Sequence, residues 1–322
     1  MSKGLFSNAK QFNARGTKNR SAFPKQFIDI CKMDQMKLKF YLVNKLREVY
    51  DEVIDEDGFI YAPGGDVVVT AHMDTVHKEP VKTFYGYVDK KKKQNIISSP
   101  QGIGGDDRCG VYMILRLIEK YRPTVIFCED EEIGGIGSNK FCNSVYINEI
   151  KGKKFIIELD RAYDKDLVFY QDDNQQFHTW CKNVTGYYEN LGSFSDISHI
   201  CPRAGISGVN ISCGYYNAHT TSEFVVLEEM EASIEAAERL ITAAEHEGSF
   251  EYVSKYSYFD FEDDYYYGNS RTDALVAFYY FGEDKKEMEA CICGATEAEC
   301  WYQFFVDNPN VCYNDIYDYE VY

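Results

Sequence analysis

A histidine and an aspartate stand two residues apart where a buried strand is expected to end. Residues 67–70 are apolar or β-branched and follow Gly64-Gly65, as in a strand of a parallel sheet. His72 and Asp74 then open onto the sheet edge where α/β folds bind their ligands. The imidazole can bind a metal and give its other N–H to the carboxylate. Taken alone, an ordinary surface pair is the simpler interpretation.

Acidic or imidazole side chains also follow the other expected strands. Glu131 and Glu132 follow a strand at 124–128, and Asp160 comes at the end of the strand that starts at Phe155. His219 comes after the strand at 208–212, and Asp106 precedes the first helix after a glycine-rich loop at 102–105. Several acids and two imidazoles at successive strand ends indicate a shared site.

The types of these side chains indicate a metal. Oxygen and imidazole ligands suit zinc, with cobalt or manganese as alternatives. The ligands are more than one zinc ion needs, which favours two ions with a bridging carboxylate.

The remaining pattern predicts the scaffold. Apolar positions at helical spacing predict helices near 36–50, 110–121 and 227–246, and alternating residues predict hairpins at 53–61 and 84–98, the latter with Lys90–Lys93 as a solvated turn. Strands alternating with helices predict an α/β fold, a mixed, mainly parallel sheet covered by helices on both faces.

Composition excludes several classes of function. The chain has 322 residues and a net charge of −18, which argues against a nucleic-acid partner. No apolar run approaches the ~18 residues of a membrane span, so no membrane partner is expected. The eleven cysteines and the absence of a secretory signal at the N-terminus predict free thiols and a cytoplasmic location.

Charge divides the chain into three parts. Residues 1–25 carry six Lys or Arg and no acid, which predicts a flexible basic arm. Residues 26–249 are expected to form the catalytic domain. Residues 250–322 hold thirteen tyrosines and sixteen acids, and predict an appended small module or a partly ordered tail, with self-association as one role. The spacing of Cys291, Cys293, Cys300 and Cys312 matches none of the strong zinc templates.

Five motifs in this order, AHMDT, GGDDRCG, EDEEIGGIGS, IELD and AHTTSE, resemble the zinc exopeptidases of the M20, M28 and M42 type over about residues 35–246. The resemblance implies a phosphorylase/hydrolase-like fold and two zinc ions. It implies the following roles: His72 and Asp160 bind the first zinc, Glu132 and His219 bind the second, Asp106 bridges both, Asp74 orients His72, and Glu131 is the general base.

Other residues at these positions have alternative interpretations. Glu158 is the rival of Asp160 as a ligand because it lies on the same strand face. Asp107 and Arg108 are expected to have a structural role, with a surface ion pair as the alternative, and Asp130 is expected to face solvent. Arg161 is expected in a plain ion pair. The remaining histidines are expected to be ordinary polar residues, with His199 as a candidate to line the cleft.

Spacing indicates the variety of enzyme. Asp160 and His219 are 59 residues apart, which leaves no room for the lid domain of the M20 type. A lidless domain closer to the M28 type is therefore expected. The DDRCG motif, however, looks more like that of the M42 or M20 type. Substrate recognition is then assigned to residues 161–205, including Asp172, Asp173, Tyr187, Tyr188 and Asp196. An acidic mouth favours a free amino terminus.

The predicted activity is therefore amide hydrolysis of a small peptide or N-acyl amino acid by an aminopeptidase or dipeptidase. A catalytically silent scaffold or binding protein of the same fold, and a single-zinc acyl or cyclising transferase, are the alternatives.

Overall fold

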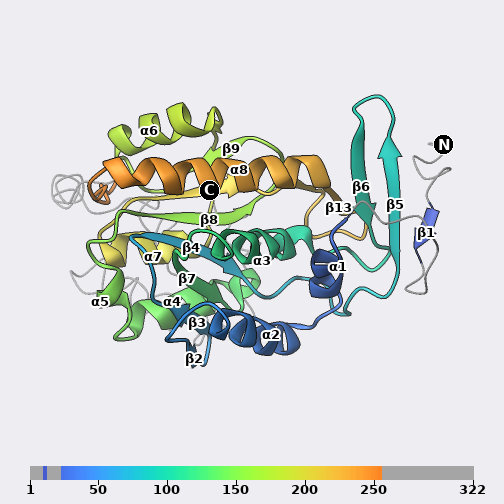
Figure 1. Ribbon diagram of the computed structural model, residues 1–322, viewed down its shortest axis with the longest axis horizontal. Coiled ribbons are helices and arrows are strands. Elements are labelled where there is room, and N and C mark those ends of the chain that lie inside the picture. Colours follow the sequence, from blue (N-terminus) through green and yellow to red (C-terminus); the bar gives the residue numbers. More distant parts are fainter. Residues whose placement is uncertain (1–9, 13–22, 256–322) are drawn as a thin grey trace, which may run out of the picture. The chain divides into compact units, whose positions relative to one another are not determined.

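The structure, a computed structural model, describes residues 10–12 and 23–255 (Figure 1). The described residues up to Lys255 belong to one compact unit. This unit includes the buried Phe250, which the sequence-based division assigned to the extension. Tyr265-Tyr266-Tyr267 and the four cysteines Cys291, Cys293, Cys300 and Cys312 lie outside the described residues.

An eight-stranded sheet forms the centre of the unit. From edge to edge, its strands are β10 (Tyr188–Glu189), β9 (Asp166–Val168), β11 (Gly208–Ser212), β8 (Phe155–Arg161), β4 (Val67–His72), β7 (Thr124–Cys128), β3 (Phe59–Ala62) and β2 (Ile54–Glu56). The four central strands β11, β8, β4 and β7 are parallel, whereas β3 and β2 form the predicted antiparallel hairpin at one edge. The predicted mixed, mainly parallel sheet is confirmed.

Helices cover both faces of this sheet (Figure 1). One face carries α1 (Lys25–Cys31), α2 (Gln35–Arg47), α3 (Gly105–Ile118), α6 (Gln175–Thr185) and α8 (Leu227–Ala243), and the other carries α4 (Ile136–Asn143), α5 (Ile147–Ile150) and α7 (Asp196–Ala204). Short 3₁₀ turns occupy η1 (Glu131–Ile133) and η2 (Ala244–His246). The three predicted helices correspond to α2, α3 and α8, the last continuing into η2.

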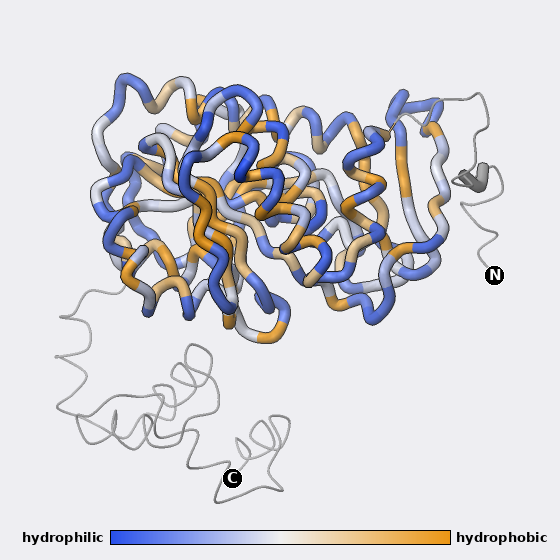
Figure 2. The backbone as a smooth tube through the Cα atoms, turned by 60° about the horizontal axis from the view of Figure 1, so that its bottom comes forward, coloured by the Kyte–Doolittle hydropathy of each residue, from blue (hydrophilic) through white to orange (hydrophobic). Residues whose placement is uncertain are grey.

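Strand β4 shows why the centre of the sheet is stable. All six of its residues are buried, and alternate side chains enter different cores, Val67 and Val69 on one face and Val68 on the other. Figure 2 shows hydrophobic residues gathered in the central strands. Strands buried on both faces are near-continuous apolar runs. Thr70 and His72 are the polar residues of β4, and the imidazole at the strand end calls for polar partners.

A smaller antiparallel sheet completes the unit. Its order is β1 (Lys10–Phe12), β5 (Phe84–Asp89), β6 (Gln94–Ser98), β13 (Phe224–Val226) and β12 (Tyr215–Tyr216). β5 and β6 form the predicted hairpin, which projects from the body in Figure 1, with Lys90–Lys93 in its exposed turn. β1 lies within the predicted basic arm and pairs with β5.

The interval between Asp160 and His219 contributes β9 to β12, α6 and α7 to the same compact unit. Within the described part of the chain it forms no separate lid, as the spacing predicts. None of the helices in that part is both long and apolar enough to cross a membrane.

Gly110 in α3 provides a test of how tightly this helix packs on the sheet. A Cβ atom there would collide with the Leu159 carbonyl oxygen and lie 2.6 Å from both carboxylate oxygens of Asp107. We expect Gly110→Ala to lower the free energy of unfolding by about 3 kcal/mol, because overpacking cannot relax against backbone. Gly248→Ala, where a Cβ would meet nothing within 4 Å, should change it by less than about 0.5 kcal/mol in the same urea titration. Equal effects of the two substitutions would contradict this packing.

Candidate metal centre

Five segments bring the predicted site residues to one edge of the eight-stranded sheet. His72 ends β4, and Asp160 lies near the end of β8. Glu131 and Glu132 form η1 directly after β7, Asp106 lies at the start of α3, and His219 lies between β12 and β13. Because β4, β7 and β8 are parallel, their carboxyl ends meet at the same edge, which is the ligand-binding edge of α/β folds.

The first group consists of His72, Asp106 and Asp160. His72 Nε2 lies 3.0 Å from Asp106 Oδ1 and 3.5 Å from Asp160 Oδ1. The His72 side chain is only 1% exposed, so these carboxylates are its immediate surroundings.

The second group consists of Asp106, Glu132 and His219. His219 Nε2 lies 3.1 Å from Asp106 Oδ2 and 3.1 Å from Glu132 Oε2. Asp106 therefore belongs to both groups and uses a different oxygen in each. The backbone of His219 has a φ of 63°, a left-handed conformation that is uncommon outside glycine and clusters at functional sites.

The donor set fits zinc on two observations. Atoms bound to one zinc at 2.0–2.1 Å in a tetrahedron lie about 3.4 Å apart, and the nitrogen–oxygen separations above are 3.0–3.5 Å. In addition, Glu132 Oε1 is buried and has no hydrogen-bond partner, although buried acceptors are normally paired. His72, Asp106 and Asp160 would hold one ion, and Asp106, Glu132 and His219 the other.

The pKa shifts of the site residues also favour a bound cation. Burial raises the pKa of Glu131 to about 9, and the charges of Asp160, Asp196 and Asp106 add to the rise. Burial also raises the pKa of Glu132 to about 7. The hydrogen bond with Asp106 raises the pKa of His219 to about 9. Glu131 and Glu132 therefore favour their protonated forms unless another positive charge is present, and a bound metal cation would supply that charge.

Asp74 does more than orient His72. Its Oδ1 lies 3.0 Å from His72 Nδ1, and its two oxygens accept from the backbone N–H groups of Glu131 and Glu132, each at 3.0 Å. One carboxylate thus fixes the ring of the first group and the position of η1. The bonds to η1 join residues that are far apart in the sequence, so spacing could not indicate them.

Three further residues hold Asp160, and the motifs do not include them. Ser195 Oγ donates to Asp160 Oδ2 at 2.8 Å, the Tyr215 hydroxyl donates to the Asp160 carbonyl at 3.0 Å, and the Asp160 N–H donates to Asn210 Oδ1 at 2.9 Å. The only sequence signal for Ser195 is its place in a capping box at the start of α7.

The structure separates Asp160 from its rival Glu158. The Glu158 side chain is buried, accepts from the N–H of Ile197 at 3.2 Å, and belongs to neither ligand group among the described residues.

Asp107 and Arg108 do not form a surface ion pair; both are buried. Asp107 accepts from the N–H groups of His72 at 3.1 Å and Gly110 at 2.9 Å. Arg108 donates to the carbonyls of Met73 and Met33. The expected structural role is therefore confirmed.

The prediction that residues 161–205 form one long loop is wrong. They fold into α6, α7 and short strands, and Asp172, Tyr187 and Asp196 are buried. Asp173 and Tyr188 are exposed but belong to neither ligand group. Arg161 forms the expected ion pair, with Asp166 at 3.1 Å. The Nδ1 atom of His199 lies 3.1 Å from Ser138 Oγ, and the His199 ring packs against Phe194.

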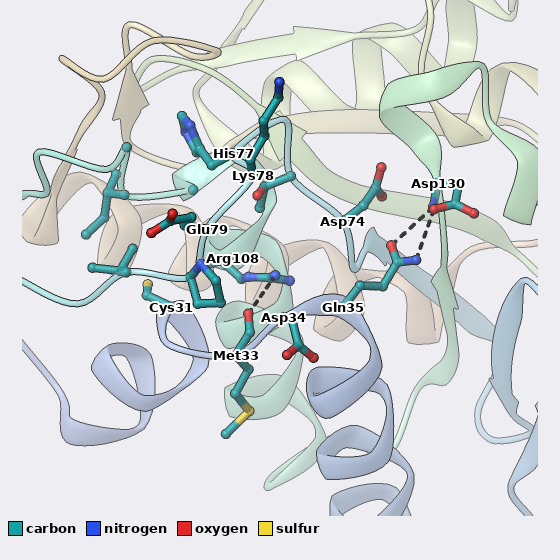
Figure 3. Close-up of a pocket in the computed structure, with 16 residues that line it drawn as sticks. Cys31, Met33, Asp34, Gln35, Asp74, His77, Lys78, Glu79, Arg108 and Asp130 are labelled. Carbon is teal, nitrogen blue, oxygen red and sulfur yellow. Dashed lines mark hydrogen bonds between the residues drawn. The ribbon is translucent and has the colours of Figure 1, made fainter.

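A cavity of about 270 Å³ lies beside Asp74 (Figure 3). Apart from Asp74, its lining includes the carboxylates of Asp34, Glu79 and Asp130, together with Lys78 and the buried Arg108. Asp130, expected to face solvent, instead bonds Gln35 at 3.0 Å. No residue of either ligand group lines this cavity, so it is a separate, acid-rich recess next to the site.

Comparison with known proteins identifies the fold. No family model matches the sequence, and no curated protein is significantly similar. Aminopeptidase PepT from Bacillus cereus superposes with a TM-score of 0.54 at 14% identity, over 67% of this chain and 96% of that one. A tripeptidase from Staphylococcus aureus superposes with a TM-score of 0.54 at 13% identity, over 69% and 97%. The chain therefore shares the fold of these two peptidases, in agreement with the fold that the motifs predict.

Zinc binding gives a direct test of the two groups. At a zinc concentration of about 100 times Kd, we expect stabilisation by about 2.7 kcal/mol, seen as a rise in Tm that EDTA reverses. Asp106→Asn should abolish most of this rise because Asp106 belongs to both groups. Asp160→Asn should reduce the rise, whereas Glu158→Gln, the matched change at the rival acid, should retain it. Loss of the rise in Glu158→Gln but not in Asp160→Asn would reverse the choice between these two acids.

Proposed function

We propose that this chain is a two-metal amidohydrolase that removes the N-terminal residue from small peptides. The observation that carries the proposal is the position of Asp106, whose two oxygens face His72 and His219 in two adjoining ligand groups. A shared carboxylate between two such groups is the arrangement of a two-metal site. In this proposal Glu131, the neighbour of Glu132, acts as the base.

The chemistry divides between the ions and the chain. Zinc ions held by His72, Asp106 and Asp160 and by Asp106, Glu132 and His219 would lower the pKa of a water molecule toward ~7 and polarise the scissile carbonyl. Glu131 takes the proton from the attacking water and passes it to the leaving amine, so that the amide C–N bond breaks and the acid and amine products form. Asp74 fixes the backbone of Glu131 for this transfer.

Three observations support a substrate with a free amino terminus. The recess beside Asp74 has an acid-rich lining, the chain carries a net charge of −18, and an acidic surface attracts cationic groups. The two structures of the same fold are an aminopeptidase and a tripeptidase. The prediction of an aminopeptidase or dipeptidase is retained.

The alternatives differ from this proposal in metal content. A single-zinc transferase needs one ligand group, whereas the described residues provide two. A silent scaffold needs none, and fewer than one ion per purified chain would favour it. The cytoplasmic location and self-association through the extension remain predictions.

Glu131→Gln tests the base. Glutamine keeps the shape of the side chain but cannot accept the proton, so we expect kcat to fall by a factor of about 10³ or more, while mass spectrometry of the metal-loaded variant still finds two ions. Asp130→Asn, the adjacent acid that bonds Gln35, should keep kcat within about threefold. An unchanged kcat in Glu131→Gln would remove Glu131 from the mechanism.

A pair of peptides tests the polarity of the substrate. The zinc-loaded protein should cleave a free-amine tripeptide at least about tenfold faster, as kcat/KM, than its N-acetylated twin, which corresponds to about 1.4 kcal/mol of discrimination. Chromatography of the products identifies the bond that is cleaved. Faster cleavage of the acetylated peptide would indicate a deacylase or carboxypeptidase instead.

A further inference from the structure

Glu223 is a fully buried carboxylate that no motif role accounts for. It lies four residues after His219, directly before β13, and its side chain is 0% exposed. Burying a carboxylate is unfavourable unless it is paired and hydrogen-bonded. The partners of Glu223 therefore indicate why it is there.

Its two oxygens bind the loop that carries Asp106. Glu223 Oε1 accepts from the N–H of Asp106 at 3.0 Å, and Oε2 accepts from the N–H of Gly104 at 2.8 Å. His77 Nε2 lies 2.9 Å from the same Oε2. The carboxylate thus joins the segment after His219, the start of α3 and the loop after β4.

Two glycines of the loop leave room for this arrangement. A Cβ atom at Gly102 would collide with the ring of His77. A Cβ atom at Gly105 would lie 2.8 Å from Tyr215 Cβ and 3.2 Å from Glu223 Oε1. The glycines before Asp106 therefore let the backbone of this loop approach the His77–Glu223 pair closely.

We propose that Glu223, held by His77, is a positioning residue that fixes Asp106 and the His219 segment so that both ligand groups keep their geometry. This proposal rests on the proposed two-metal function. Glu223 lies on the segment of one ligand of the second group and bonds the backbone of the ligand common to both. A shift of the Asp106 backbone would displace both of its oxygens, so the binding of both ions depends on Glu223.

Glu223→Gln tests the role with little change in volume. Glutamine presents an amide NH₂ in place of one carboxylate oxygen. One of the N–H groups that Glu223 accepts from, or His77, then faces a donor instead of an acceptor and loses its hydrogen bond. We expect zinc affinity, measured by competition with a chromophoric chelator, to fall about 10–100-fold, as for other residues that support metal ligands. The visible spectrum of the cobalt-loaded protein should also change, because it reports the geometry around the ion.

Asp172→Asn is the matched control. Asp172 is a buried acid that likewise accepts from two backbone N–H groups, of Asn174 at 3.0 Å and Val253 at 3.2 Å, and it lies in neither ligand group. It should lower Tm without changing zinc affinity or the cobalt spectrum. A purely structural role of Glu223 would give the same result as this control.

His77 provides a second pair of variants in case Glu223→Gln does not fold. His77→Ala removes the partner of Glu223 and should weaken zinc binding, whereas His77→Gln retains an N–H donor and should restore much of the affinity. Wild-type affinity in both Glu223→Gln and His77→Ala would overturn the positioning role while leaving the two-metal function intact. Failure of the wild-type chain to bind zinc would overturn both proposals.

Discussion

Repulsion among carboxylates at one sheet edge is the constraint on which the rest of this structure depends. Asp106, Glu131, Glu132 and Asp160 converge there. Burial and, after it, the neighbouring acids raise the pKa of Glu131, Glu132 and Asp160, whereas hydrogen bonds with His219 and His72 lower the pKa of Asp106. Such a cluster is unfavourable for folding unless cations or protons neutralise it. The apolar core of the sheet, with β4 buried on both faces, stabilises the fold enough to hold the strand ends in place despite this repulsion. The imidazoles of His72 and His219, the nearest basic groups, each lie between two of these acids.

Acids outside the ligand groups hold the backbone of residues in these groups and of the adjacent Glu131. Asp74 accepts from the N–H groups of Glu131 and Glu132, Glu223 accepts from that of Asp106, and Asp107 accepts from that of His72. Each of these carboxylates bonds to amides, so it stabilises the segment without competing for the ion. Hydrogen bonds to charged groups are stronger than neutral ones, so these bonds help to fix the end of β4, the start of α3 and η1 at the edge of the sheet.

The sequence predicts the parts of this site that depend on local order. Periodicity reveals the strand or helix boundaries beside five site residues, His72, Asp106, Glu131, Glu132 and Asp160. His219 is indicated by its motif, because periodicity does not reveal β12 and β13 on either side of it. The order of the motifs gives the resemblance. Ser195, Tyr215 and Glu223 could not be predicted in the same way, because their contacts join positions 35, 55 and 117 residues apart. The interval 161–205 was misinterpreted for a related reason. Its polar residues suggested a surface loop, but Asp172 and Tyr187 are turned inward by packing that only the tertiary structure defines.

The two ligand groups also differ in what supports them. His72 and Asp160 lie on central strands of the eight-stranded sheet and are almost completely buried. His219 lies between two strands of the smaller sheet, and its side chain is 54% exposed. The first group is therefore built on the rigid core, whereas the second requires the two sheets to keep their relative positions. Asp106 contacts ligands from both sheets, and Glu223 ties its backbone to β13. Because β13 pairs with β6, the β5–β6 hairpin belongs to the same support: the smaller sheet holds the less rigid half of the centre against the more rigid half.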